Sequence, residues 1–290
     1  MPEDRPADPL AETAAQLDAV HPRFGFDPGT PAGPEWHRFD TLTDGRLAGW
    51  AAELTGEGRA PSEVAMSLLS GMTGPVVRPL AVASILFARL PLVTSATVWV
   101  RRRGRITDRA ALTCPVAVLA DDPLAGRTPV VADLRAELAE RLVGLCAPVV
   151  DELHRATRYG RRNLWGGLGD VLSSHSLWAG RHRGDDPDAL VDLFAEVQGV
   201  LDRVRDRIGV NFDRPVPFPL RGHGRATLAQ VRGTCCLHYR IPSRTHADGS
   251  PRYCGTCPLI DDEERRVRLR PLVEPAATAA RTAHLGTPTG

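Results

Sequence analysis

The sequence predicts an α+β fold: a mostly helical body with a small antiparallel sheet, followed by a short cysteine-rich module. Three observations lead to this prediction. Apolar residues recur at helical spacing through residues 61–90 and again through 131–208. Short β-branched runs at 95–102 and 115–120 separate the two helical regions. Four of the six cysteines gather within residues 235–257.

The first helical region is expected to contain two helices. The segment 61–72 begins "PSEVAM", in which Ser62 can serve as the N-cap before an apolar-periodic run. The segment 78–90 is almost wholly apolar and should be buried. Upstream, residues 1–35 are rich in Pro, Gly and Asp around one helical candidate at 9–20. That composition predicts a loosely held arm.

The runs at 95–102 and 115–120 are the expected strands of the sheet. Gly104 and the turn-like "TDR" of 107–109 lie between them. The period of the pattern changes here from about 3.6 to about 2 residues, as expected where helices give way to strands.

The second helical region reads as three helices. Residues 131–156 are amphipathic, with Pro148 expected to break or kink the helix. Residues 161–180 form a weaker candidate because they contain three closely spaced glycines. Residues 187–208 open with a proline and keep their large apolar residues on one face. The Pro- and Gly-rich stretch 209–224 is expected to be a linker.

These elements suggest four parts. We expect a flexible N-terminal arm over 1–35, a helical body over 36–224, a C-terminal cysteine module over 225–270 and a flexible tail over 271–290.

Composition excludes several classes of partner and location. The formal net charge is +1, with all 36 basic residues being arginine, so no overall charge favours nucleic acid or a membrane surface. The apolar region 75–100 is interrupted by Arg and Pro, which argues against an integral membrane segment. The acidic N-terminus does not resemble a secretory signal, so a cytoplasmic location is expected. Reduced thiols in that compartment count against structural disulfides.

The cysteine segment is the main candidate for chemistry. Cys254 and Cys257 form a C-x-x-C turn that can bring two thiolates to one metal. Cys235 and Cys236 are adjacent, and in an extended segment neighbouring side chains diverge. Divergence suits a cluster with two metal centres better than one tetrahedral ion, while a disulfide between neighbours would be strained. On this chemistry an iron–sulfur cluster leads, with zinc and a redox dithiol as alternatives.

A histidine lies next to the cysteine pair. His238 could replace one thiolate, as histidine does in some two-iron centres. The alternative is a structural histidine beside Tyr239.

The stretch "CCLHYRIP…CGTCPL" resembles the C-terminal signature of the ferric siderophore reductases of the FhuF type. The resemblance implies a [2Fe–2S] cluster bound by Cys235, Cys236, Cys254 and Cys257. It extends more loosely over residues 60–270. One departure is the gap between the cysteine pairs, which is seventeen residues here (237–253) and shorter in the family.

The resemblance implies an oxidoreductase. A ferric-siderophore reductase would pass one electron from its cluster to siderophore-bound Fe³⁺, and the softer Fe²⁺ would leave hard oxygen ligands such as hydroxamates. The expected partners are a ferric siderophore and a ferredoxin-like electron donor. The "GGLGDV" at 166–171 lies inside a helical pattern and lacks dinucleotide-binding spacing.

Three further residues are candidates for substrate binding. Arg162 and Trp165 could line a pocket with Trp165 stacking on the ligand, and Arg240 could meet an anionic siderophore. The alternatives are a core tryptophan and solvated arginines. Other functions remain open: a non-redox siderophore-handling protein with structural zinc, an iron–sulfur sensor, or a thioredoxin-like dithiol enzyme.

Overall fold

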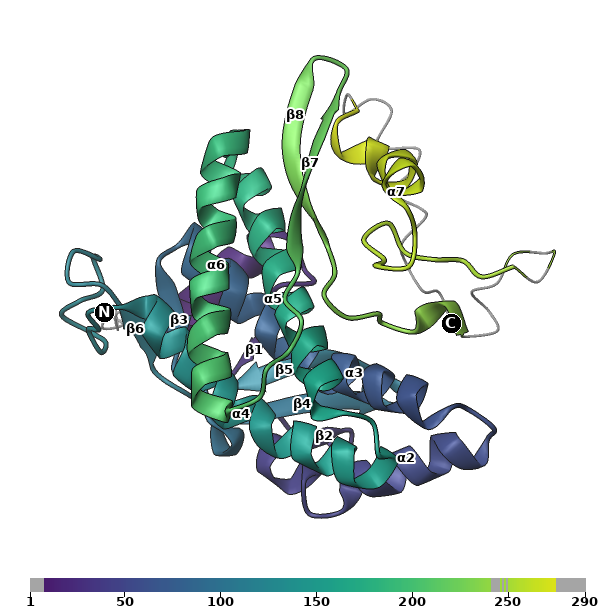
Figure 1. The fold of residues 1–290 in the computed structure, drawn as a ribbon. Helices are drawn as coiled ribbons and strands as arrows, with labels where there is room; N and C mark the ends of the chain where they lie inside the picture. Colours follow the sequence, from purple (N-terminus) through teal and green to yellow (C-terminus); the bar gives the residue numbers. More distant parts are fainter. Residues whose placement is uncertain (1–7, 241–245, 247, 249, 275–290) are drawn as a thin grey trace.

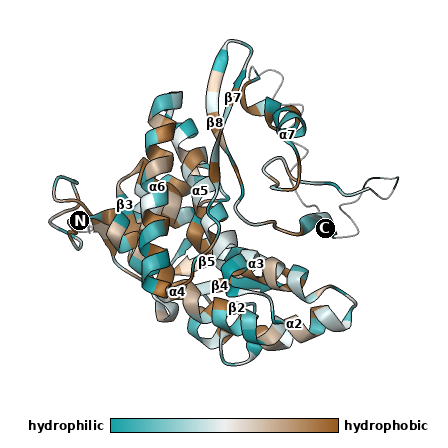
Figure 2. Cartoon of the chain, in the orientation of Figure 1, coloured by the Kyte–Doolittle hydropathy of each residue, from teal (hydrophilic) through white to brown (hydrophobic). Residues whose placement is uncertain are grey.

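The computed structural model describes residues 8–240, 246, 248 and 250–274, and it has the predicted α+β architecture (Figure 1). Four helices form most of the body: α3 (Pro61–Leu86), α4 (Leu134–Thr157), α5 (Arg161–Arg183) and α6 (Pro187–Ile208). Helix α5 packs against both α3 and α6, and α4 packs against α3 and α6. Helix α6 carries hydrophilic and hydrophobic residues on different sides (Figure 2), so its apolar face closes the core.

Helix α3 is one continuous helix where the sequence predicted two. Pro75 and Pro79 lie inside it, and Pro61 opens it. Ala60 is the N-cap and makes no side-chain capping bond, so the expected cap at Ser62 is wrong; Pro61 at the first position explains the shift, since proline fits a helix start. By length and composition α3 is apolar enough to cross a membrane, but 72% of that stretch is buried inside the protein.

Local sequence signals are misleading in helix α4 and accurate in helix α6. Pro148 lies within α4 without ending it, so the expected break does not occur. Helix α6 keeps its predicted bounds because Asp186 caps its first turn and Gly209 takes a left-handed conformation at its end. Helix α5 is regular over its glycines.

A four-stranded sheet covers part of α3, in the order β1–β5–β4–β2. Its strands are β1 (Asp27–Pro28), β5 (Ile106–Leu112), β4 (Val98–Arg103) and β2 (Trp36–Arg38). Strands β4 and β5 form a hairpin around Gly104, and the "TDR" expected in a turn lies within β5. The pairs β4–β5 and β2–β4 are antiparallel, while β1 pairs with β5 in parallel. The two predicted strands, 95–102 and 115–120, correspond to β4 and to β6 (Val116–Val118), and they lie in different sheets because β5 comes between them in the chain and pairs with β4. A separate antiparallel pair joins β3 (Arg89–Pro91) to β6 (Val116–Val118).

The N-terminal segment belongs to the body from residue 8 onward. Helix α1 (Pro9–Val20) buries Leu10 and Leu17, and Phe24 and Phe26 follow it into the core. The expected boundary at residue 35 therefore does not coincide with an edge of the core. Helix α2 (Arg46–Gly56) packs on α4 and α3. Short 3₁₀ helices span Phe39–Leu42, Ser95–Thr97, His238–Arg240 and Arg270–Leu272.

The C-terminal module begins earlier than predicted. Residues 209–224 were expected to be a linker, but Val216–Gly222 form β7, which pairs antiparallel with β8 (Arg225–Val231). The prolines of β7 are tolerated because this two-stranded ribbon leaves one edge of β7 unpaired. Helix α7 (Asp262–Leu269) lies beside the hairpin (Figure 1). Phe218, Leu220, Ala229 and Val273 form a second, small core there.

Candidate functional site

A buried carboxylate on α5 fixes the chain just before the cysteine pair. The Asp170 side chain is about 1% exposed and accepts hydrogen bonds from the backbone N–H of Gly233 (2.8 Å) and Thr234 (3.1 Å). Its Oδ2 also pairs with Arg232 Nε at 3.2 Å. Three successive residues after β8 are therefore anchored to one side chain, which sets where Cys235 starts.

This anchor requires close approach of the backbones. A side-chain Cβ on Gly166 of α5 would lie 2.1 Å from Thr234 Oγ1, and a Cβ on Gly233 would lie 2.3 Å from the carbonyl oxygen of Asp213. Neither position has room for a larger residue. Gly166, one of the three glycines that weakened the sequence-based helix prediction, thus lets the cysteine segment pack on α5.

The chain turns sharply at the cysteine pair. Leu237 has a φ of 58°, in the left-handed region that non-glycine residues seldom adopt. Its N–H points back and donates to Cys235 Sγ at 3.5 Å, while its side chain is buried in the main core. Such strain persists where the surroundings enforce it, and it is common at functional sites.

The C-x-x-C segment is a tight turn held from two sides. Cys257 N–H donates to the carbonyl of Cys254 at 3.1 Å, and Arg232 N–H donates to the carbonyl of Thr256 at 3.0 Å. From α7, Arg265 donates to the carbonyls of Cys257 (3.0 Å) and Ile260 (2.8 Å). These bonds bring the turn to the end of β8, next to the first cysteine pair.

The four thiols meet as two pairs, each with one cysteine from either segment. A hydrogen bond from the Cys254 thiol, helped by His238 and the charge of Arg232, outweighs burial and lowers the pKa of Cys236 to about 3. The same bond raises the pKa of Cys254. Burial raises the pKa of Cys235 to about 11, and Cys257 lies within hydrogen-bond reach of it. Cys236 and Cys257 are buried, and the other two are partly exposed.

Among the residues that the structure describes, no three Cys, His, Asp or Glu side chains surround one point closely enough to hold one metal ion. His238 hydrogen-bonds to Cys236. The rings of Tyr239 and Tyr253 lie 5.0 Å apart and join the two cysteine segments by a second contact.

The three predicted substrate-binding residues do not come together in a pocket. Trp165 is 4% exposed and lies in the core of the body, where it cannot stack on a ligand arriving from solvent. Arg162 is exposed and paired with Asp213 at 2.6 Å. Arg240 is exposed beside the Tyr239 ring, at 5.7 Å from its centroid. Within the seventeen-residue gap between the cysteine pairs, residues 241–245, 247 and 249 lie outside the described residues.

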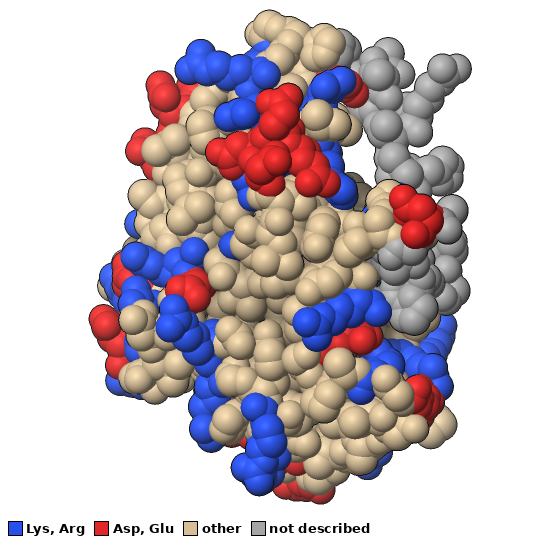
Figure 3. All heavy atoms as spheres, turned by 45° about the vertical axis from the view of Figure 1, so that its right-hand side comes forward, with Lys and Arg blue, Asp and Glu red and all other residues tan. Residues whose placement is uncertain are grey.

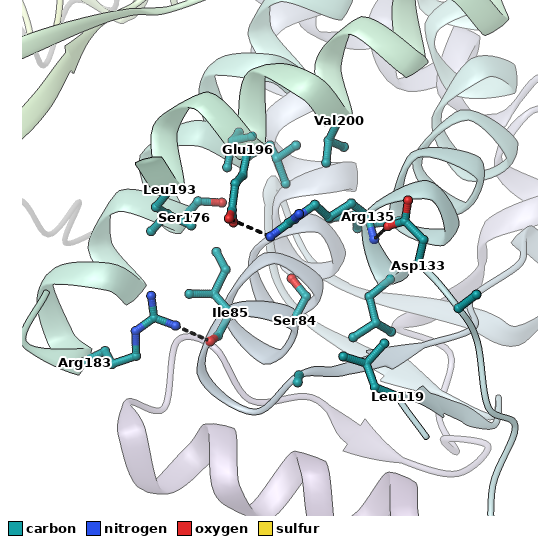
Figure 4. Close-up of a pocket in the computed structure, with 16 residues that line it drawn as sticks. Ser84, Ile85, Leu119, Asp133, Arg135, Ser176, Arg183, Leu193, Glu196 and Val200 are labelled. Atoms are coloured by element: carbon teal, nitrogen blue, oxygen red, sulfur yellow. Dashed lines mark hydrogen bonds and ion pairs between the residues drawn. The ribbon is translucent and has the colours of Figure 1, made fainter. Parts of the chain in front are cut away.

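An apolar cavity lies elsewhere in the body, between α3, α4, α5 and α6 (Figure 4). Its volume is about 350 Å³ and most of its walls are aliphatic. Arg135 pairs with Glu196 at 2.6 Å across it, and Arg183 donates to the carbonyl of Ile85 at 2.9 Å (Figure 4). Its arginines are thus already engaged, and the cysteines do not line it.

The residues that build the cysteine site went unrecognised in the sequence. Asp170, Arg232 and Arg265 carry no motif, and the only signal was a lone carboxylate in the apolar, glycine-rich part of α5. The surface charge does not mark a binding site either, because basic and acidic groups are interspersed over the face in Figure 3. Cys114 and Cys146 are buried, and burial raises the pKa of each thiol to about 12, which makes them poor nucleophiles.

No family model and no curated protein matches the chain. The fold is similar to that of aerobactin synthetase IucA from a hypervirulent pathotype of Klebsiella pneumoniae, at 16% identity and a TM-score of 0.49. Its ATP-bound form matches at 15% identity and a TM-score of 0.45. The match covers 57% of this chain and 40% or 39% of the synthetase, so this chain aligns with well under half of that protein.

These comparisons correct the expected activity. The similar structures are synthetases and not reductases, and the prediction of a ferric-siderophore reductase, an oxidoreductase, is withdrawn on that finding. The expected ferredoxin-like donor has no role without the reductase and is not carried further. Nor does the likeness transfer a synthetase activity, because identity this low speaks only of fold.

Proposed function

We propose that this chain is an iron–sulfur protein that binds a [2Fe–2S] cluster through Cys235, Cys236, Cys254 and Cys257. The observation that carries the proposal is the meeting of four thiols as two cross-segment pairs. A two-iron cluster takes four thiolates, two on each iron. A structural zinc ion instead takes four ligands around one point, and metal analysis of the purified protein distinguishes the two.

The surroundings of the thiols support the same proposal. Thiolates and sulfides carry negative charge, and Arg232 supplies a positive charge beside Cys236. The Leu237 N–H already donates to Cys235 Sγ. Charge and N–H···S bonds of this kind tune cluster potential and stabilise the bound form. The cysteine signature shared with FhuF-type proteins points the same way.

The proposed role of the cluster is to join the C-terminal module to the body, as in an iron–sulfur sensor. Each thiol pair has one member anchored to α5 through Asp170 and one held by α7 through Arg265. Binding to such a site stabilises only the conformation in which both segments are in place. Loss of the cluster would release the 254–257 turn from the 235–236 pair.

The experiment is an anaerobic purification followed by absorption and EPR spectroscopy and by iron, sulfide and zinc analysis. We expect visible bands that bleach with dithionite, an EPR signal after reduction, and about two irons per chain. Cys236→Ser should abolish these signals. The matched control, Cys114→Ala, removes a buried thiol of the body and should keep them.

Two outcomes contradict the proposal. One is a colourless protein with one zinc per chain that takes up no cluster from iron and sulfide. The other is a cluster retained unchanged in Cys236→Ser. The sensor role has its own readout: limited proteolysis between residues 241 and 253 should be faster in the cluster-free protein than in the loaded one, and equal rates would refute it.

A siderophore is the proposed small-molecule partner, supported by the cysteine signature alone. A gallium–hydroxamate complex tests this binding without any electron transfer, because Ga³⁺ is not reduced under these conditions. A saturable heat of binding in calorimetry supports the partner, and no heat at millimolar ligand rules out this siderophore class.

A further inference from the structure

A second site lies farther along α5, toward its C-terminal end, where arginines from three segments converge on a small cavity. Arg23 follows α1, Arg78 lies on α3 and Arg181 lies on α5. The cavity has a volume of about 180 Å³, and no Asp or Glu is among its lining residues in the described part of the chain. This is a concentration of positive charge without a matching carboxylate.

Arg78 is the unusual member of this group. Its neighbours on α3, Val77 and Leu80, are fully buried. No hydrogen bond or ion pair joins its guanidinium to any residue that the structure describes, and burial together with the charge of Arg23 lowers its pKa. The Arg78 side chain is itself half-buried, and a charge that is partly removed from water without a partner is unfavourable, so proteins pair such groups or bind a counter-ion there.

Arg78 differs in its partners from a second arginine of this region, Arg89. Arg89 is buried, and it has partners: Glu12 at 2.8 Å, Gln16 at 3.1 Å and Asp122 at 3.4 Å. The fold thus supplies carboxylates to Arg89, and none of the carboxylates that the structure describes pairs with Arg78. The missing counter-charge at Arg78 is best explained by a ligand.

The remaining lining groups suit an oxyanion. Arg181 donates through Nη1 to the carbonyl of Leu228 at 2.8 Å, which fixes the guanidinium and leaves further N–H groups free. Burial lowers the pKa of Arg181 to about 10, so it stays charged at neutral pH. The Ser174 hydroxyl also lines the cavity. The packed rings of Phe24 and Trp178, 4.4 Å apart, form an apolar wall.

We propose that this cavity binds a small multivalent oxyanion, a phosphate or a short dicarboxylate, with Arg78 and Arg181 as the principal contacts. Guanidinium groups match such anions with paired, charge-assisted hydrogen bonds. The volume sets an upper limit on the ligand, since drug-sized and nucleotide-sized molecules occupy pockets of roughly 300–1,000 Å³. No cysteine is among the described residues that line the cavity.

The test is thermal unfolding and calorimetry of the full chain in chloride buffer of low ionic strength. Inorganic phosphate and succinate are titrated separately, so that the two sources of oxyanion are distinguished. At least one should raise the melting temperature in a saturable way. Arg78→Gln should weaken that anion at least about 10-fold, the value of one charged hydrogen bond. Without anion, Arg78→Gln should unfold no earlier than the wild type, because it removes an unpaired charge.

The control is Arg103→Gln, which removes an exposed arginine at the end of β4 and should leave the response unchanged. The proposal is overturned if neither anion stabilises the wild type at millimolar concentration. It is equally overturned if Arg78→Gln and Arg103→Gln respond alike.

Discussion

Asp170 is predicted to be the residue on which the placement of the cysteine module depends most. Its carboxylate is buried, pairs with Arg232 and accepts the N–H groups of Gly233 and Thr234. Asp170→Ala would leave a buried guanidinium unpaired, and breaking a buried pair costs roughly 3–5 kcal/mol. Each of the two N–H groups left without an acceptor costs about 1–3 kcal/mol, and these effects overlap. We expect a loss of about 3–5 kcal/mol of unfolding free energy.

Asp170→Asn separates the charge from the hydrogen bonds. The amide oxygen still accepts one N–H, and no carboxylate has to be desolvated. Burial raises the pKa of Asp170 to about 6, which means that the folded protein disfavours the charged form. The loss for Asp170→Asn should therefore be clearly smaller than for Asp170→Ala.

The assay is urea unfolding followed by circular dichroism at neutral pH, on reduced and metal-free protein so that ligand binding does not contribute. Asp206→Ala, an exposed aspartate on α6, is the matched control and should change stability by less than about 0.5 kcal/mol. A loss for Asp170→Ala within about 0.5 kcal/mol of that control would refute the anchoring role.

Three other substitutions test the remaining structural reasoning. Gly166→Ala should lower the free energy of unfolding by about 1–3 kcal/mol, because the added Cβ would clash with Thr234. Gly199→Ala lies on α6 with open space around it and should raise the free energy of unfolding by about 0.5–1 kcal/mol. Equal effects of the two substitutions in urea unfolding would contradict the close packing at Gly166. Trp165→Ala should cost about 3–5 kcal/mol as a core truncation, and a change in ligand affinity without loss of stability would restore its role in a binding pocket. Burial lowers the pKa of His175 from 6.5 to about 4, so the unfolded chain binds more protons in this range and stability should fall as pH drops from about 6.5 to 4. His175→Gln should show a smaller fall between these pH values, and an equal fall would disprove the assignment.

Local signals in the sequence determined the helices with clear ends. Asp186, Pro187 and Gly209 define α6, and its bounds were predicted to the residue. The four cysteines were also identified from spacing alone, because a C-x-x-C and an adjacent pair are unusual in any chain. Residues close in sequence specify these features, so no knowledge of the tertiary structure is needed.

Tertiary packing decided the features that sequence reasoning missed. Pro75 and Pro79 do not end α3, because burial on all sides of this helix outweighs the lost backbone bonds. The proline-rich stretch after α6 forms β7 because it pairs with β8 along one edge, while its other edge is unpaired and tolerates residues without an N–H. The turn between the two strands is tight, with positive φ at His223 and Gly224. Neither property is visible in a window of a few residues.

The sequence by itself determined the α+β class, the ends of α6 and the set of four thiols. Only the tertiary structure decided that the thiols meet as two cross-segment pairs and that Asp170 anchors them from more than sixty residues away. It also decided that Arg78 has no carboxylate partner within the described part of the chain. The physical reason is the same in each case. Each of these features depends on which groups, distant in sequence, lie together in the low-dielectric interior, where a charge or an N–H is costly unless another group pairs with it.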